Sequence, residues 1–198
     1  MRTVKFIDRQ NPEISFGRIA FEIMNRWILV SGSAHYRIAE IEFYLRNDNW
    51  HKDIYTHTHP MQKTSHRWYF HGSGIDITFG QDDFYGGILL RAIYDLDKEK
   101  YYYGPLVLLQ ELFRNFPGVH DTKLIFGLIP DTENRIEQEK PIAAPRVGLN
   151  PKHNEVMYEK NYRFLVMAKK KHAEKTRIYE AMKKSGKYTK KELDNIWG

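Results

Sequence analysis

The segment Ala39–Leu45, AEIEFYL, alternates apolar and polar side chains with a strict spacing of two residues. Successive side chains of a β-strand point to opposite faces of its sheet, so this pattern predicts a strand with one core face and one polar face. The core face consists of apolar side chains: Ile41, Phe43 and Leu45. The opposite face consists of polar ones: Glu40, Glu42 and Tyr44. Either this polar face is the solvent side of a surface strand, or it lines a functional site.

The rest of the chain predicts a mixed α+β domain with several strands. Apolar residues that recur every three or four positions predict helices at 15–26 and 104–116, and Pro105 suits a first helical turn. The polar stretch 46–66 predicts a long loop. Alternating or short apolar runs predict the strands: two within 27–45 around a Gly/Ser turn at 31–33, and others within 72–80, 86–95, 123–130 and 162–167.

The chain of 198 residues is long enough for one domain with a single substantial core. We expect this domain to span residues 1–167 and a basic helical tail to follow at 168–198. The tail contains ten Lys or Arg and four Asp or Glu, so it accounts for the whole net charge of +6. Two short helices broken near Gly186 are expected there, the second begun by a capping box at Thr189 and Glu192. Such a tail attracts phosphate backbones, or it is a solvated extension.

Missing sequence features exclude several classes of protein. The chain has no cysteine, which excludes disulfides and thiolate metal sites. The N-terminal segment MRTVKFIDRQ lacks the apolar core of a secretory signal, and no apolar run approaches the ~20 residues that span a bilayer. We therefore expect an intracellular, cytoplasmic protein without a membrane partner, associated with the nucleoid if it is bacterial. The motifs of nucleophile elbows, P-loops and dinucleotide-binding turns are missing too.

Histidines are concentrated in the predicted loop and just after it. Five of the nine fall within 21 residues: His51, His57, His59, His66 and His71. His57 and His59 could bind a metal ion together, but a zinc site normally has three or four ligands, and no metal-binding helix motif occurs. We therefore expect polar or base-contacting histidines, with no metal and no cofactor.

Arg91 interrupts the apolar run GILLRAI. Arginine is almost never fully buried unless it is paired, so this residue needs an acidic partner. One interpretation is a structural ion pair with Glu40 or Glu42. The other is a catalytic pair, in which Arg91 and Glu42 hold a water molecule and Glu42 acts as the general base.

The order of these motifs resembles that of the alkyladenine (3-methyladenine or methylpurine) DNA glycosylases. RIAEIEFYL is similar to the strand of that family that ends in Glu-x-Tyr, and GILLRAI to its Val-Leu-Leu-Arg-Ala strand. YGPLVLLQEL resembles its Gly-Pro helix start, and AAPRVGL with NYRFLVM resembles its Ala-x-Arg-Val-Gly segment and closing strand. GRIAFEIMNRWILV matches its first helix and strand more weakly. The likeness runs from about Ser15 to Met167.

The resemblance implies a fold, a reaction and a set of site residues. The expected fold is a curved, mostly antiparallel sheet flanked by helices, as in the methylpurine DNA glycosylases and the C-terminal domain of formyltransferases. The expected reaction is removal of a damaged purine from DNA by base flipping and attack of water on the sugar. Glu42 and Arg91 take the places of the catalytic residues. The positions of the base-binding residues fall on Tyr44, His57 and Phe79.

One departure from the family lies between the strands at 72–80 and 86–95. The family has a β-hairpin there that wedges into the minor groove, whereas this chain has only GQDDFYGG. Phe84 or Tyr85 would have to serve as the wedge, because apolar and aromatic side chains can separate base steps. Asp82 and Asp83 beside them would repel phosphates. In the tail, we expect phosphate contacts from the three consecutive lysines Lys169, Lys170 and Lys171.

Three functions therefore stay open, with DNA repair favoured. The first is a DNA glycosylase that removes alkylated or deaminated purines without a cofactor. The second is a nucleic-acid-binding protein that kept the pocket and lost catalysis, which the shortened hairpin favours. The third is a hydrolase of free nucleosides. The sequence leaves open the preferred lesion, the choice between single and double strands, and the oligomeric state.

Overall fold

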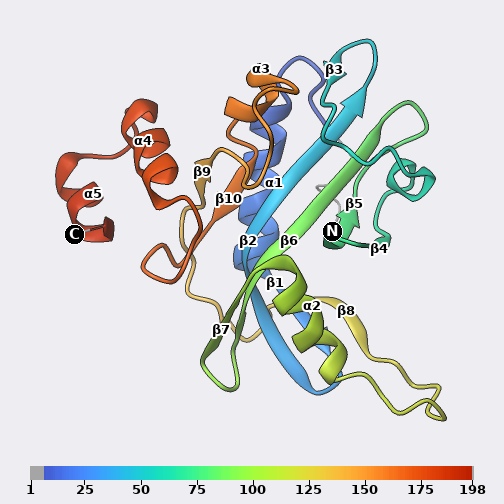
Figure 1. Cartoon of the computed structure of the whole chain (residues 1–198). Helices are drawn as coiled ribbons and strands as arrows, with labels where there is room; N and C mark the ends of the chain where they lie inside the picture. Colours follow the sequence, from blue (N-terminus) through green and yellow to red (C-terminus); the bar gives the residue numbers. More distant parts are fainter. Residues whose placement is uncertain (1–6, 198) are drawn as a thin grey trace.

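The computed structural model, which describes residues 7–197, is built around two long antiparallel strands (Figure 1). These strands are β2 (Ala34–Asn47) and β6 (Tyr85–Asp95), and they pair along most of their length. The N-terminal residues 1–6, which entered the expectation about a secretory signal, lie outside the described residues.

The other strands extend the sheet on both sides of this centre. The main strand order is β4-β5-β6-β2-β1-β8, and every recorded pairing is antiparallel. Because β2 is long, its start pairs with β1, its middle with β10 and its end with β3. The bounds are β1 Trp27–Ser31, β3 His51–Lys52, β4 Trp68–His71, β5 Gly74–Thr78, β7 Lys100–Tyr103, β8 Phe126–Pro130, β9 Ile142–Ala144 and β10 Arg163–Leu165.

The sheet is strongly curled. Trp68 on β4 contacts Phe126 on β8 with ring centroids 4.8 Å apart, so the two ends of the strand order approach each other. The fold is thus a single α+β domain with a half-barrel of antiparallel strands flanked by helices, which confirms the expected fold class.

The tight turn between β1 and β2 places Gly32 at φ +59°, and a Cβ atom there would lie 2.5 Å from the backbone oxygen of Asn115.

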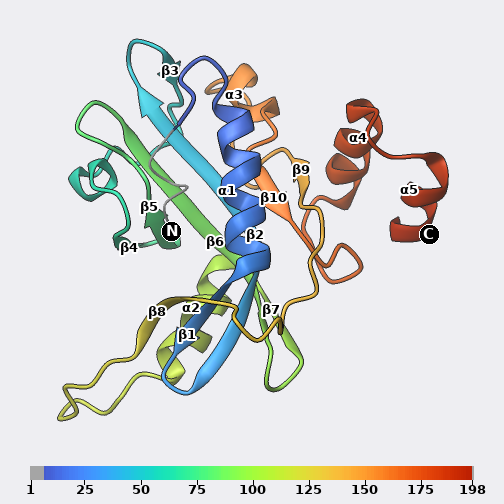
Figure 2. The same ribbon diagram turned by 180° about the vertical axis from the view of Figure 1, so that it is seen from behind.

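Helix α1 (Pro12–Arg26) covers one face of the sheet, and Figure 2 shows it lying across β2. Its apolar stripe is fully buried, and Phe16 stacks on Phe43 with ring centroids 4.4 Å apart. Ile41 and Leu45 also have no exposed surface. The predicted alternation of β2 is therefore confirmed, and the polar residues of this strand lie on the face away from α1.

The remaining helices surround the sheet. Their bounds are η2 Pro60–Lys63 (a 3₁₀ helix), α2 Pro105–Arg114, α3 Glu155–Glu159, α4 Lys175–Ser185 and α5 Lys190–Trp197. Within residues 7–197, no helix is long and apolar enough to cross a membrane. The predicted loop at 46–66 contains β3 and η2, so that prediction was only partly right.

The two tail helices dock on the domain rather than extending from it. Ile178, Met182 and Leu193 form a second apolar cluster with residues of β9 and β10. Gly186 ends α4 in the left-handed conformation, and Glu192 accepts hydrogen bonds from Thr189 as a capping box requires. The predicted break and cap are both confirmed. Figure 1 shows α4 and α5 to the left of β9, beyond this edge of the sheet.

Candidate active site

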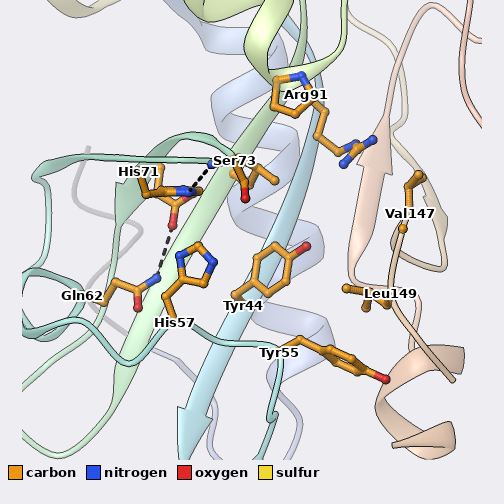
Figure 3. A pocket seen from close by; sticks show the side chains of 13 residues that line it. Tyr44, Tyr55, His57, Gln62, His71, Ser73, Arg91, Val147 and Leu149 are labelled. Atoms are coloured by element: carbon orange, nitrogen blue, oxygen red, sulfur yellow. Dashed lines mark hydrogen bonds and ion pairs between the residues drawn. The ribbon is translucent and has the colours of Figure 1, made fainter. Parts of the chain in front are cut away.

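A cavity of about 240 Å³ opens on the sheet face opposite α1. Figure 3 shows Tyr44 at its centre, with His57 and His71 on one side and Val147 and Leu149 on the other. Arg91 also lines the cavity. The structure therefore brings together the side chains of Tyr44, His57 and Arg91, which come from separate parts of the sequence.

Glu42 lies directly behind the cavity wall and has no exposed surface. Its Oε1 accepts a hydrogen bond from the backbone N–H of Val147 at 2.7 Å. Its Oε2 accepts from the Tyr44 hydroxyl at 2.8 Å and from Nη1 of Arg91 at 3.4 Å. All three donors belong to residues that line the cavity. A carboxylate offers about four acceptor sites, so Glu42 keeps one of them free.

Arg91 bridges two buried carboxylates. Besides its contact with Glu42, its Nε donates to Oε1 of Glu40 at 3.0 Å. Burial lowers the pKa of Arg91, but the charges of Glu42 and Glu40 outweigh this effect and raise that pKa above its usual value. Arg91 therefore forms the ion pair that the sequence suggested, and it does so with Glu40 and Glu42 at once.

Glu40 is the centre of an ion cluster that the sequence did not reveal. Four donor atoms lie within 3.0 Å of its carboxylate: Nε of Arg91, Nε and Nη2 of Arg163, and Nδ1 of His172. Burial opposes ionisation, but the hydrogen bond from His172 and the charge of Arg163 prevail, so the pKa of Glu40 lies below its usual value. Three of these atoms form hydrogen bonds with Glu40, and Nε of Arg163 adds an ion-pair contact at 2.9 Å.

A second buried ion pair supports Tyr44 from behind. Arg146 and Asp53 have no exposed surface and are joined by two contacts of 2.6 and 3.1 Å. The Arg146 guanidinium also lies 4.6 Å from the centroid of the Tyr44 ring. Burial and then the charge of Glu42 raise the pKa of Tyr44 well above its usual value, so its hydroxyl stays protonated and donates to Glu42.

The other wall of the cavity contains a carboxylate that the sequence analysis missed. Asp76 Oδ1 accepts from Nε2 of His71 at 3.0 Å, and its Oδ2 accepts from Nε2 of Gln62 at 3.2 Å. His57 lies edge-on to His71 with ring centroids 4.6 Å apart. Burial, and then the neighbouring His71, lower the pKa of His57 below its usual value. His57 is therefore neutral at pH 7.

Phe79 is placed differently from the expectation. It has no exposed surface, and it lies in the core against Phe16 and Phe43. Phe79 points to the core because alternate residues of a strand point to opposite faces of the sheet. Ile75, Ile77 and Phe79 point to the core, whereas Asp76 points to the cavity. The assignment of Phe79 as a stacking residue was wrong, and Asp76 is the residue that this segment contributes to the wall.

The expected wedge also takes another position. Phe84 is only 2% exposed and packs against Phe79 and Trp50. The turn is so tight that Gln81 and Phe84 exchange two backbone hydrogen bonds of 3.0 Å, which directs Phe84 inward. Phe84 is therefore a core residue. Tyr85 is partly exposed, with Nζ of Lys63 at 4.8 Å from its ring centroid.

Lys169, Lys170 and Lys171 are exposed, as phosphate contacts would have to be. Nζ of Lys170 lies 5.7 Å from the ring centroid of Tyr94, and Nζ of Lys171 lies 5.9 Å from that of Tyr103. Tyr103 is two residues before Pro105, which lines the cavity. Lys170 and Lys171 therefore lie next to β6 and β7.

The two histidines considered as metal ligands both lie beside Tyr69 but have different further contacts. The ring of His59 stacks on Tyr69, and its Nδ1 accepts the backbone N–H of Met61 at the start of η2. In the part of the chain that the structure describes, no group of three or more His, Asp or Glu is placed to hold a metal ion.

Comparison with known proteins gives a distant relative. No protein-family model matches the chain. The chain is 28% identical over 200 residues to a protein of Acanthamoeba polyphaga mimivirus named "Uncharacterized protein L759". The alignment covers 83% of this chain and 92% of the viral protein. The similarity therefore extends over almost the whole viral protein, whose name states no activity.

Proposed function

We propose that this protein is a DNA glycosylase that hydrolyses the N-glycosidic bond of a damaged purine. The observation that supports this most is the environment of Glu42. Its buried carboxylate keeps one free acceptor site directly behind a cavity lined by Tyr44 and Arg91. The resemblance to alkyladenine DNA glycosylases assigns catalytic roles to Glu42 and Arg91.

The size of the cavity suits a nucleobase. Pockets for drug-sized ligands are about 300–1,000 Å³, and this one is about 240 Å³. A flat base in it would contact the Tyr44 ring, and base–aromatic stacking contributes about 1–3 kcal/mol. The rear of Tyr44 is supported by the guanidinium of Arg146, which fixes the ring in place.

In the proposed reaction, a water oxygen attacks the sugar carbon that carries the base. The N-glycosidic bond breaks, and the base leaves with the bonding electrons. The water gives its proton to the free acceptor site of Glu42, while Arg91 stabilises the resulting charges. His57 hydrogen-bonds to the leaving base. Because Glu42 has no exposed surface, a small displacement of the Tyr44 hydroxyl or of Arg91 must admit the water.

The buried Phe84 limits how the base reaches the cavity. Since this residue belongs to the core, the turn at 80–85 has only the partly exposed Tyr85 to offer as a wedge. We therefore propose single-stranded DNA, or a base that has already left the stack, as the substrate. The exposed lysines at 169–171 would contact its phosphates.

The same observation favours a second candidate, hydrolysis of free nucleosides. A nucleoside needs no wedge, because its base is not stacked in a duplex. The cavity and the roles of Glu42 and Arg91 would be unchanged.

The test is release of purine bases from single strands, duplexes and free nucleosides that contain alkylated or deaminated purines. Base release by the wild type is expected to fall about 100- to 10,000-fold in Glu42→Gln, the range typical for loss of a general base. Glu133→Gln, the same substitution at an exposed position, is the matched control. Release from nucleosides alone would favour the second candidate. Salt-dependent DNA binding without any release would contradict both and indicate a binding protein.

A further inference from the structure

The wall opposite Val147 contains His57 and, beside it, three side chains that the proposed reaction does not use: Gln62, His71 and Asp76. Figure 3 shows His71, Gln62 and His57 together on this side of the cavity. Asp76 lies between His71 and Gln62 and is hydrogen-bonded to both. This group can therefore contact the part of a bound base that is remote from the sugar.

The sheet register fixes where Asp76 lies relative to Glu42. Both residues are in register with Leu89, Asp76 from β5 and Glu42 from β2. Residues directly opposite each other in neighbouring strands point to the same face, so the two carboxylates flank Leu89 on the cavity side. Two inter-strand spacings separate their backbones, which is about 10 Å. A two-ring base above Leu89 therefore has Glu42 at one end and Asp76 at the other.

The hydrogen bonds of Asp76 leave it with free acceptor sites. Nδ1 of His71 accepts the backbone N–H of Ser73 at 3.3 Å, so the ring hydrogen is on Nε2 and points to Asp76. Oε1 of Gln62 accepts the backbone N–H of His59, so its amide NH₂ points to Asp76. Each oxygen of Asp76 thus has one protein donor. With about two acceptor sites per oxygen, each keeps one for a ligand.

No Lys or Arg forms an ion pair with this carboxylate among residues 7–197, where its only ion-pair partner is the imidazole of His71. Arg91 is shared between Glu42 and Glu40 instead. A buried carboxylate without a lysine or arginine partner favours a ligand that brings N–H donors or positive charge. It disfavours a ligand with a ring acceptor or an anionic group at this position.

The sheet is built to hold this carboxylate. Gly87 is paired with Thr78 and is the diagonal neighbour of Asp76 across the two strands. A Cβ atom at residue 87 would overlap Asp76 Oδ2 and lie 2.7 Å from Nε2 of Gln62. Any larger residue would displace the pair from the wall. Asp76 and Gln62 therefore occupy space that the absence of a side chain at Gly87 provides.

We infer that the Asp76 wall selects guanine-type bases, in which a ring N–H and an amino group lie side by side. This inference rests on the proposed function and narrows its substrate. The two adjacent donors match the two free acceptor sites of Asp76. Hypoxanthine has the ring N–H without the amino group, and adenine presents a ring acceptor beside its amino group. A guanine alkylated on its five-membered ring keeps both donors and adds a positive charge.

The experiment measures the binding of guanosine, inosine, adenosine and 1-methylguanosine by calorimetry, with base release followed in the same samples by chromatography. Guanosine is expected to bind about tenfold or more tightly than inosine, as for other paired contacts to a base edge. 1-Methylguanosine, which lacks the ring N–H, is expected to lose this advantage. Equal binding of guanosine and 1-methylguanosine would overturn the inference without any protein variant.

Asp76→Asn replaces acceptor sites by an amide that also donates, so the preference for guanosine over inosine is expected to disappear. Asp82→Asn is the matched control, because it removes the same charge from an exposed position. A preference that survives in Asp76→Asn would overturn the inference. Base release without a preference for guanosine would contradict the inference but support the proposed function. A preference for guanosine without base release from any substrate would support the inference but contradict the proposed function.

Discussion

Three carboxylates on the cavity face differ in how many of their acceptor sites the protein fills. Buried charges are tolerated only where hydrogen bonds or ion pairs replace water. Glu40 and Glu42 each accept three hydrogen bonds and Asp76 accepts two, and Glu40 has a further ion-pair contact with Nε of Arg163. Two arginines and a histidine thus enclose Glu40, as expected for a structural residue. Glu42 and Asp76 keep free sites, which is why the proposed chemistry and the proposed base selection fall on them.

At this scale, Gly87→Ala tests whether the Asp76 wall depends on an empty space. The new methyl group would overlap Asp76 Oδ2 and crowd Gln62, and overpacking of this kind costs about 1–3 kcal/mol. Urea unfolding should show this loss of stability, and calorimetry should show weaker binding of guanosine. Gly127→Ala is the control, because this strand glycine has no atom within 4 Å of the added Cβ. Equal stability of the two variants would contradict the prediction.

The long elements followed from the sequence, whereas several of the short strands did not. The strands β2 and β6 and the helices α1 and α2 each contain several repeats of their period, so their pattern is clear. The strands β3, β7 and β9 have two to four residues, and pairing with distant neighbours defines them more than their own composition does.

The same contrast holds for the candidate site. Glu42, Tyr44 and Arg91 lie on the two long strands, where an acidic or basic residue in an apolar run is conspicuous. Asp76 in IDIT gives the same signal and was overlooked. Because alternate residues of a strand point to opposite faces, a polar-face Asp76 would have predicted that Phe79, three residues later, points to the core. Asp53 and His172 lie in polar stretches, and only the tertiary fold brings them to their arginine and glutamate partners.

The segment before α4 is tied to the ion cluster by His172, whose side chain is fully buried against Glu40. The folded-state pKa of Glu40 lies below its usual 4.5. Its ionisation therefore contributes stability above pH 4.5, and this contribution disappears as the pH falls through the lower folded-state value. In His172→Ala, the strongest of the interactions that lower this pKa is lost, while burial still raises it.

We therefore expect His172→Ala to unfold at a higher pH than the wild type in an acid titration followed by circular dichroism. At neutral pH, the variant should lose about 1.5–3 kcal/mol, typical for a hydrogen bond to a charged group. His120→Ala, which removes an exposed histidine, should titrate like the wild type. The assignment would be contradicted by an unchanged midpoint of acid unfolding in His172→Ala.

At the scale of the whole molecule, the two faces of the curled sheet have different roles. One face holds α1 and the main apolar core, whereas the other holds the cavity and its charged network. The basic tail folds back through the apolar cluster that α4 and α5 form with β9 and β10. Lys170 and Lys171 lie next to β6 and β7, against Tyr94 and Tyr103. Part of the positive charge of the tail is therefore held next to β6, the strand that contains Arg91.

The position of these lysines can be separated from their charge by measuring how salt weakens binding to single-stranded DNA. Each phosphate contact on a single strand contributes about −0.7 to the slope of log affinity against log salt concentration, so replacing all three lysines by alanine should reduce the slope by about 2. The control replaces Lys183, Lys184 and Lys187, exposed residues at the end of α4 that remove the same charge. If net charge alone governed binding, both triple variants would change the slope equally. Contacts at the cavity rim instead require a clearly larger change for Lys169, Lys170 and Lys171.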